Sequence, residues 1–475
     1  MCIRDRGSAI PETGSLETSN SSVNQLISNT LWGQRSNYLS VPTDCPQRDE
    51  RLGWSGDTQV FIGAASYNAN VAGFFNKWGQ DARDSQTSVG QYTDTIPRSA
   101  AVGAGNAAWG DAGIIVPYTM FKMYGDTQII SQMYDSMEKY MNWLNSRGFE
   151  GAGTAYCDWL APNEQDNQGI IRNLIACAYY AYDTQLMAEM SDAIGETQKA
   201  EAYRARFNEI KDHFQEKYIN NDGTLAAGAD TQTGYLITLK VGLFKDDDQK
   251  QAATDILVNK IKANGNKLGT GFVGTAMLNQ TLTEVGAVDM AYTLLLQRDN
   301  PAWMYSIDQG ATTIWERWNS YTKENGFGPV DMNSFNHYSY GAIVEWMYSD
   351  MLGIKADEDQ PGFKHIILKP QPDRRADEDI PANQERITWV KGSYDSAYGM
   401  INAKWNWSED GFNYTAAIPA NTTATAYIPV EKDMEVTVNG IPADEFEKEK
   451  DGIKYVDTVE GNAVFEITAG TYEFK

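Results

Sequence analysis

The sequence predicts a mainly α-helical chain that closes into a toroid and ends in an all-β sandwich domain. From about Leu16 to Leu352, apolar residues recur at spacings of three and four, and turns rich in glycine and asparagine separate them, which is typical of successive amphipathic helices. After about residue 357, short strand-like stretches alternate with turn dipeptides. A chain of 475 residues is long enough for one large and one smaller domain.

The helical pattern is clearest in two segments. In the segment 174–194 the apolar positions fall on one helical face: Leu174, Ala178, Tyr182, Leu186 and Met190. In the segment 201–214 they do the same: Tyr203, Phe207, Ile210 and Phe214. A long series of helical hairpins can close into a ring, with loops at one end forming a cleft. We therefore expect a helical domain over residues 15–356, preceded by a leader over residues 1–14 that is non-native or disordered.

The character of the chain changes at the polar, proline- and glycine-containing linker 356–362. Strand-like stretches occupy residues 365–368, 398–405, 412–418, 424–428 and 463–468. Turn dipeptides stand between them: Asn439-Gly440, Asp451-Gly452 and Glu460-Gly461. We therefore expect residues 357–475 to form a β-sandwich.

Composition excludes several classes of partner. The formal net charge of −25 repels polyanions, so neither nucleic acid nor an anionic membrane surface is expected as a partner. No run of eighteen apolar residues predicts a membrane span. Aromatic residues make up 12% of the chain, which suits stacking against sugar rings but equally suits an ordinary large core. Composition leaves these two interpretations open.

The cysteines and histidines lack the spacing of a metal site or a disulfide framework. We expect no metal, and we expect Cys45 to pack as a small apolar side chain. Residues 1–6 contain no apolar signal-peptide core and look unrelated to the rest of the chain, so we expect a truncated gene with a spurious start. The sequence therefore assigns no cellular compartment.

The segment from Asp44 to Asp57 carries the strongest chemical signal. It holds four carboxylates, two arginines and Trp54, and prolines and glycines shape it into a loop that leads into a helix. Carboxylates so close together repel one another unless their charge is used or neutralised. One interpretation is a structural loop in which Arg48 and Arg51 neutralise the acids. The other is a catalytic loop.

A second acidic position, Glu316, lies between Trp315 and Trp318. A carboxylate beside indole rings loses hydration, which tunes its proton affinity. The alternative is an amphipathic helix with Glu316 on its solvated face, since the two tryptophans lie three positions apart. Together the two clusters supply acids in different surroundings, and hydrolysis of a glycosidic bond needs such a pair. One carboxyl group protonates the leaving oxygen, and the other activates water on the opposite face of the sugar.

Four strings in this order resemble the α-L-rhamnosidases of glycoside hydrolase family 78. They are Thr43–Trp54, Gly271–Thr275, Gly310–Trp318 and Asn336–Gly341. The resemblance covers nearly the whole chain after about Gly14. It implies an (α/α)6 barrel followed by a β-sandwich, and an inverting enzyme that needs no organic cofactor. It also implies a rhamnose-containing glycoside or oligosaccharide as the substrate.

Carried over by position, the resemblance implies roles for nine residues. Glu50 resembles the general acid and Glu316 the general base. The residues implied to hold the rhamnose hydroxyls are Asp44, Arg48 and Asp57. The residues implied to form an aromatic wall are Trp54, Trp109 and Trp159. His337 resembles a further sugar contact, although a lone histidine in an aromatic stretch is often a core residue.

Family members usually carry β-rich domains before the barrel, whereas this chain starts almost at the barrel. Two other functions stay open at this point. One is a different glycosidase on the same barrel, of the glucosidase, trehalase or uronyl hydrolase type, because fold alone does not fix the substrate. The other is a non-catalytic glycan-binding protein, which would not require both Glu50 and Glu316.

Overall fold

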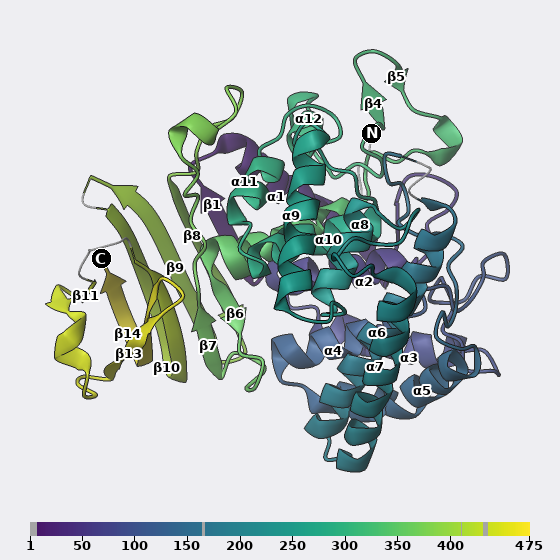
Figure 1. Cartoon of the computed structure of the whole chain (residues 1–475), viewed down its shortest axis with the longest axis horizontal. Helices are drawn as coiled ribbons and strands as arrows, with labels where there is room; N and C mark the ends of the chain where they lie inside the picture. Colours follow the sequence, from purple (N-terminus) through teal and green to yellow (C-terminus); the bar gives the residue numbers. More distant parts are fainter. Residues whose placement is uncertain (1–6, 164–166, 410, 431–435) are drawn as a thin grey trace.

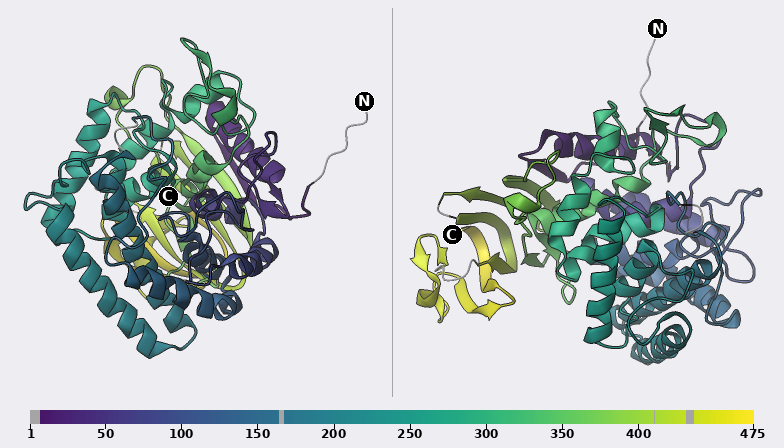
Figure 2. Two further views of the ribbon diagram at one scale, coloured as in Figure 1. Left: turned by 90° about the vertical axis from the view of Figure 1, so that its right-hand side faces the viewer. Right: turned by 45° about the horizontal axis from the view of Figure 1, so that its top comes forward.

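The computed structural model describes residues 7–163, 167–409, 411–430 and 436–475. Figure 1 shows a helical part beside a twisted β-sheet, and the sheet is built mostly from the C-terminal quarter of the chain. The predicted architecture, a helical toroid followed by a β domain, is confirmed. The helices form a ring in the left view of Figure 2, with the sheet behind it.

The inner helices of the ring pack against one another in sequence. They are α2 (Ser55–Asn68), α4 (Ala112–Tyr124), α6 (Ile170–Ala193), α8 (Gln232–Lys240), α10 (Phe272–Glu284) and α13 (Ile343–Trp346). The last of these follows a short turn, η3 (Ser339–Ala342), and continues into a π-helical turn, η4 (Met347–Leu352). Each inner helix contacts the next, and α13 contacts α2, so the ring closes.

The outer helices alternate with the inner ones along the chain. They are α1 (Ser21–Asn37), α3 (Ala72–Ser85), α5 (Thr127–Ser146), α7 (Thr197–Tyr218), α9 (Asp247–Ala263), α11 (Val288–Leu295) and the short α12 (Trp303–Asp308). Burial differs between α2 of the inner set and α7 of the outer set. Every residue of α2 is buried, whereas α7 buries a single stripe that includes Ile210 and Phe214. The two segments predicted from periodicity are confirmed as α6 and α7.

The large sheet runs in the order β1-β8-β9-β10-β14-β11-β12, with β13 on β14, β7 on β10 and β6 on β7. Its strands are β1 (Gly14–Thr18), β6 (Ile354–Ala356), β7 (His365–Leu368), β8 (Trp389–Ser396), β9 (Gly399–Ser408), β10 (Gly411–Pro429), β11 (Thr437–Val438), β12 (Ile441–Pro442), β13 (Ile453–Val459) and β14 (Asn462–Phe474). Two small hairpins lie in the helical part: β2 (Tyr38–Leu39) with β3 (Val41–Pro42), and β4 (Tyr321–Thr322) with β5 (Gly326–Phe327).

The long strand β10 joins two parts of this sheet. Its first half pairs with β9, and its second half pairs in parallel with β7. Its register on β14 shifts between Ile418 and Thr423. The sequence predicted two strands here, 412–418 and 424–428, and the structure makes them one strand with an irregularity where its neighbour changes.

The N-terminal segment packs on both parts of the protein. Residues 1–6 of the predicted leader lie outside the described residues. Within residues 7–14, Glu12 forms an ion pair with Arg35, and the Thr13 hydroxyl donates to the Tyr67 carbonyl oxygen (3.2 Å). Strand β1 then pairs with β8, with Gly14 opposite Tyr394. This part of the predicted leader is therefore ordered against the protein, and the domain boundaries near residues 15 and 357 stay predictions.

The sheet covers one end of the ring. Helical turn η4 ends at Leu352, directly before β6, so the C-terminal end of this inner segment faces the sheet. Trp405 of β9 is buried there, and its indole N–H donates to the Met351 carbonyl oxygen (2.6 Å). The opposite end of the ring, where η3 begins, faces away from the sheet. Among the described helices, none combines the length and apolar character that crossing a membrane requires.

Candidate active site

A cavity of about 230 Å³ lies at the end of the ring away from the sheet. Its lining comes from the segments that lead into inner helices α2, α4, α6 and α10 and turn η3, and from the loop after α12. All nine residues implied by the sequence line this cavity: Asp44, Arg48, Glu50, Trp54, Asp57, Trp109, Trp159, Glu316 and His337. Three further residues also line it: Tyr156, Phe272 and Met332.

Arg48 connects the two carboxylates that were predicted to be catalytic. Its Nε donates to Glu50 Oε2 (2.7 Å), and Nη2 donates to the same oxygen. Its Nη1 donates to Glu316 Oε2 (2.8 Å), and Nη2 also reaches Glu316 Oε1 (3.2 Å). A planar guanidinium thus presents one forked edge to each carboxylate. Residues far apart in the sequence are thereby held on two sides of one charged group.

The two carboxylates have different surroundings. The Glu50 side chain is 28% exposed, whereas that of Glu316 is 3% exposed. The indole N–H of Trp54 donates to Glu50 Oε1 (2.7 Å), so Trp54 orients this carboxylate from the start of α2. Glu50 therefore lies nearer the mouth of the cavity, and Glu316 lies deeper.

The segment around Glu316 is a loop, which excludes the amphipathic helix that the spacing of its tryptophans allowed. Backbone hydrogen bonds of the antiparallel type hold this loop against the segment 334–337. The Glu316 N–H donates to the Ser334 carbonyl oxygen (2.9 Å), and the His337 N–H donates to that of Ile314 (2.8 Å). This pairing brings Glu316 and His337 to the same wall of the cavity, although they are 21 positions apart.

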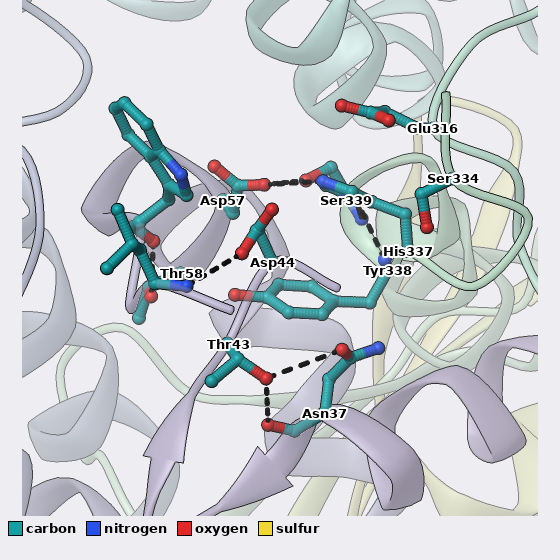
Figure 3. Close-up of polar contacts among 12 residues, drawn as sticks. Asn37, Thr43, Asp44, Asp57, Thr58, Glu316, Ser334, His337, Tyr338 and Ser339 are labelled. Atoms are coloured by element: carbon teal, nitrogen blue, oxygen red, sulfur yellow. Dashed lines mark hydrogen bonds and ion pairs between the residues drawn. The ribbon is translucent and has the colours of Figure 1, made fainter. Parts of the chain in front are cut away.

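Asp57 and His337 form a buried pair beside the cavity. His337 Nε2 lies 3.0 Å from Asp57 Oδ1, which also accepts a hydrogen bond from the Ser339 hydroxyl (3.1 Å; Figure 3). The Tyr338 N–H donates to His337 Nδ1 (3.1 Å), which leaves the ring proton on Nε2, facing Asp57. Burial lowers the pKa of His337, while the hydrogen bond and the charge of Asp57 raise it, and the net shift is upward.

Asp44 is a buried carboxyl group close to two other acidic side chains, and both features raise its pKa. Burial, followed by repulsion from Asp57 and Glu50, raises the pKa of Asp44 to about 7, against the opposing charge of His337. The Leu52 N–H donates to Asp44 Oδ1 (3.0 Å), and Arg48 Nη2 is 3.7 Å from Oδ2. The loop therefore holds a carboxyl group that exchanges its proton near neutral pH.

Three tryptophans surround Tyr156 on the opposite wall. The Tyr156 ring centroid lies 5.6 Å from that of Trp54, 4.4 Å from Trp109 and 5.9 Å from Trp159. Close packing of Trp109 requires a glycine at position 56, because a Cβ atom there would lie 2.4 Å from the indole. Gly56 therefore leaves the space that Trp109 occupies in the aromatic wall.

Buried Asp158 holds this wall against the start of α10. Its carboxylate accepts hydrogen bonds from the N–H groups of Gly271 (2.7 Å) and Gly274 (3.0 Å) and from the Thr233 hydroxyl. The Phe272 N–H in turn donates to the Trp159 carbonyl oxygen (2.9 Å). Burial raises the pKa of Asp158, and these hydrogen bonds oppose the shift.

Two of the three lining residues that were not predicted have a partial signal in the sequence. Tyr156 stands three positions before Trp159, and Phe272 lies inside the string Gly271–Thr275 that was already singled out. Met332 ends the short 3-10 turn η2 (Val330–Met332), which follows β5, without any comparable pattern.

Among the described residues, one group of potential metal ligands lies in the site. Atoms of Asp44, Cys45 and Glu50 lie within 4.8 Å of one another. Burial, followed by the charge of Asp44, raises the pKa of the Cys45 thiol to about 12. Glu50 is already paired with Arg48. Cys45 is a free, buried cysteine, and its thiol also interacts with the Asp44 carboxyl group.

Comparisons with known proteins agree with this fold. The profile of the bacterial alpha-L-rhamnosidase 6 hairpin glycosidase domain matches residues 11–351, and that of the bacterial alpha-L-rhamnosidase C-terminal domain matches residues 353–440. An alpha-L-rhamnosidase of Streptomyces avermitilis is 38% identical over 467 residues, which are 98% of this chain and 42% of the relative. One from Formosa agariphila is 35% identical, over 98% of this chain and 49% of the relative.

Solved structures give the same result. The Streptomyces avermitilis alpha-L-rhamnosidase complexed with L-rhamnose superposes with a TM-score of 0.88 at 37% identity, over 98% of this chain and 42% of that chain. An alpha-L-rhamnosidase from Dictyoglumus thermophilum superposes with a TM-score of 0.87 at 28% identity, over 98% and 50%. This chain spans about half the length of these relatives. It belongs to the family of bacterial alpha-L-rhamnosidases with a six-hairpin glycosidase domain.

Proposed function

We propose that this chain carries the catalytic unit of an inverting glycoside hydrolase that releases terminal α-L-rhamnose from rhamnosides. The observation that carries the proposal is the pair Glu50 and Glu316, held on two edges of the Arg48 guanidinium in one cavity. A cavity of about 230 Å³ suits a single terminal sugar better than the middle of a long chain.

The separation of the two carboxyl groups decides the stereochemical outcome. Inverting enzymes hold them roughly 6.5–9.5 Å apart, which leaves room for the attacking water, whereas retaining enzymes hold them roughly 5–5.5 Å apart. Here Arg48 Nη2 contacts both Glu50 Oε2 and Glu316 Oε1, so one nitrogen bridges the nearest oxygens of the pair. We therefore infer inversion from the family resemblance and not from this contact.

In the proposed reaction, Glu50 donates its proton to the glycosidic oxygen while the bond from that oxygen to C1 breaks. Glu316 accepts a proton from a water molecule whose oxygen forms the new bond to C1 from the opposite face. The products are rhamnose of inverted configuration and the protonated leaving group. The greater exposure of Glu50 places the acid near the mouth, where a leaving group departs.

The remaining lining suits a deoxy sugar. Asp44, Asp57 and His337 offer buried polar atoms for hydroxyl groups. The tryptophans, Tyr156 and Phe272 form an apolar surface for the methyl group and the C–H faces of rhamnose. Arg48 would exchange part of its contact with the carboxylates for contacts with the sugar.

Hydrolysis of p-nitrophenyl α-L-rhamnopyranoside tests this function, with p-nitrophenyl β-D-glucopyranoside and an unsaturated uronide as competing substrates. We expect turnover of the rhamnoside alone, and none with the Glu316→Gln protein prepared in the same way. Faster cleavage of either competitor would favour another glycosidase on this barrel. Binding of rhamnosides without any turnover would favour the glycan-binding alternative.

A further inference from the structure

The aromatic wall of the cavity is centred on Tyr156, and the hydroxyl group of this residue is bound from behind. The Tyr156 ring contacts all three tryptophans of the wall. Its hydroxyl donates to Asp94 Oδ2 (3.2 Å). Asp94 is completely buried and is not among the residues that line the cavity. A buried carboxylate therefore holds the central residue of the wall without reaching the cavity itself.

Asp94 also links the three chain segments that carry this wall. Its carbonyl oxygen accepts the N–H of Ser55 (3.0 Å), which follows Trp54 and begins α2. Its carboxylate accepts the backbone N–H (3.2 Å) and the side-chain amide (2.6 Å) of Asn106. The Asn106 carbonyl oxygen in turn accepts the Trp109 N–H (3.0 Å). With the tyrosine hydroxyl, Asp94 therefore contacts all three segments.

The bonds of Asn106 require hydrogen-bond acceptors at position 94. Asn106 Oδ1 accepts the Ala155 N–H (2.8 Å), so the amide NH2 of Asn106 faces Asp94. The backbone N–H of Asn106 is a second donor that faces Asp94. An ionised carboxylate offers an acceptor to both donors and to the tyrosine hydroxyl. A protonated carboxyl group or an asparagine amide would turn one acceptor into a donor, and at least one of these bonds would be weakened.

Three ionisable groups face Asp94 from the elements packed around it. They are Tyr156 from the loop before α6, Asp111 at the start of α4 and Tyr140 of α5. Burial, and to a smaller extent the charge of Asp111, raises the pKa of Asp94 to about 6, against the hydrogen bonds that it accepts. The Asp94 carboxyl group therefore changes its protonation state within the pH range of ordinary enzyme assays.

We propose that Asp94 is a positioning residue for the aromatic wall, and that its ionised carboxylate holds Tyr156 in the position that binds rhamnose. When the carboxylate is protonated or replaced, the tyrosine hydroxyl loses this acceptor and the ring is held less tightly among the tryptophans. Sugar binding then weakens, while Glu50 and Glu316 keep their contacts with Arg48. This inference rests on the proposed function, because it concerns how that site binds its sugar.

Asp94→Asn tests this role, because it keeps the size of the side chain and replaces one acceptor by a donor. At about pH 8 we expect KM for p-nitrophenyl α-L-rhamnopyranoside to rise about fivefold, with a much smaller change in kcat. At about pH 5 the unmodified protein also has a protonated Asp94, so the ratio of the two KM values should approach one. A ratio taken at each pH cancels the titration of groups that both proteins share, such as Asp44.

Two tyrosine variants locate the effect. Tyr156→Phe removes the other partner of the same hydrogen bond, so it should raise KM with the same pH dependence, and the double variant should raise KM by less than the product of the two single effects. Tyr134→Phe is the control. The Tyr134 hydroxyl shares a buried hydrogen bond with that of Ser191 (2.6 Å), near the end of α6 that lies away from the cavity. This variant should lower Tm and leave KM unchanged. If Asp94→Asn fails to fold, Tyr156→Phe carries the test at both pH values.

The outcomes separate this role from the function on which it rests. With the rhamnoside still cleaved, an unchanged KM for Asp94→Asn overturns the proposal and leaves the rhamnosidase function standing. A KM ratio that is equal at both pH values also overturns it, because the effect then does not follow the charge of the carboxylate. A fall in kcat alone would place the effect on the acid or the base, which is a third contradicting result. No cleavage by the unmodified protein contradicts the function and this role of Asp94 together.

Discussion

Glu50 and Glu316 meet at Arg48, yet each has its own environment. Glu50 is the more exposed and is oriented by Trp54, whereas Glu316 is buried in a loop fixed by backbone pairing. An acid at the mouth can reach the leaving oxygen, and a base below it can reach water behind the sugar. In the proposed mechanism, this difference in environment separates the roles of two chemically identical side chains.

Glu50→Gln tests the role of the acid. We expect kcat on a rhamnosyl disaccharide to fall by about 10²–10⁴, the usual contribution of a general acid. The loss on p-nitrophenyl rhamnoside should be much smaller, because that leaving group needs little protonation. Steady-state kinetics on both substrates measure the difference. Equal losses on the two substrates would contradict the assignment.

Asp44 predicts a pH dependence of stability. Its pKa is raised from 3.8 to about 7, so the folded protein binds this proton more tightly than the unfolded chain does. The resulting stabilisation is fully present below pH 3.8 and is lost as the pH rises to about 7. Asp44→Asn should therefore show a smaller fall in Tm across this window than the unmodified protein, together with reduced activity.

A control for this prediction lies in the same loop. Asp49→Asn makes the same change of charge at a fully exposed side chain, so its Tm profile should follow that of the unmodified protein. Calorimetry at a series of pH values compares the three proteins. Parallel profiles for all three would show that Asp44 does not titrate in this window.

At the residue scale, the identities of the site residues were more predictable from the sequence than the contacts between them. The sequence predicted the identities of nine lining residues, because acids beside prolines, glycines and tryptophans are unusual and the family strings are specific. The bridge made by Arg48 was not predicted, since it depends on how a loop before α2 meets a loop before η3. The central position of Tyr156 among three tryptophans likewise depends on that packing.

At the scale of elements, a buried ion pair links the first part of the β domain to the helical ring. Asp373 and Arg375 are 0% and 1% exposed, and Arg375 Nη2 donates to Asp373 Oδ2 (2.8 Å). Gln384 accepts from Arg375 Nη1 (2.7 Å) and donates to the Thr293 carbonyl oxygen in α11 (3.0 Å). The pair thus connects the segment between β7 and β8 to the helical ring.

Arg375→Met should destabilise the protein by about 3–5 kcal/mol, because it leaves the Asp373 carboxylate buried and unpaired. The double variant Asp373→Asn/Arg375→Met should recover part of this loss. Urea denaturation measures both. A single variant as stable as the unmodified protein would show that water reaches Asp373 and that the pair contributes little.

Elements with a local pattern were predictable, and elements defined by distant partners were not. Helix α7 shows its buried stripe in the sequence because one of its sides faces solvent. Strand β1 contains one large apolar residue, Leu16, and its partner β8 lies at the far end of the chain. No local signal could have assigned β1 to the C-terminal sheet.

At the scale of the whole molecule, the candidate active site and the β-sheet lie at opposite ends of the ring. The sheet covers one end, and the β4–β5 hairpin, from the same loop as Glu316, lies away from it (Figure 1). The toroid was predictable from successive helices and the family strings. The position of the sheet was not, because it depends on contacts such as that between Trp405 and Met351.

Removal of residues 357–475 should lower Tm or cause aggregation. It uncovers apolar surface worth about 25 cal/mol per Å² and leaves β1 without its partner β8. Any folded fraction should keep its preference for rhamnosides, because none of the described residues that line the catalytic cavity belongs to the removed segment. A truncated protein of unchanged Tm that cleaves glucosides as well would contradict this division.

The central claim is that two separated carboxylates hydrolyse an α-L-rhamnoside with inversion. Proton NMR of the first-formed sugar from p-nitrophenyl α-L-rhamnopyranoside, recorded before mutarotation, tests it most directly. We expect β-L-rhamnose to appear first, with the α anomer growing in later. If α-L-rhamnose appears first, the configuration is retained, and a nucleophile about 5 Å from the acid would have to replace Glu316 in the role of base.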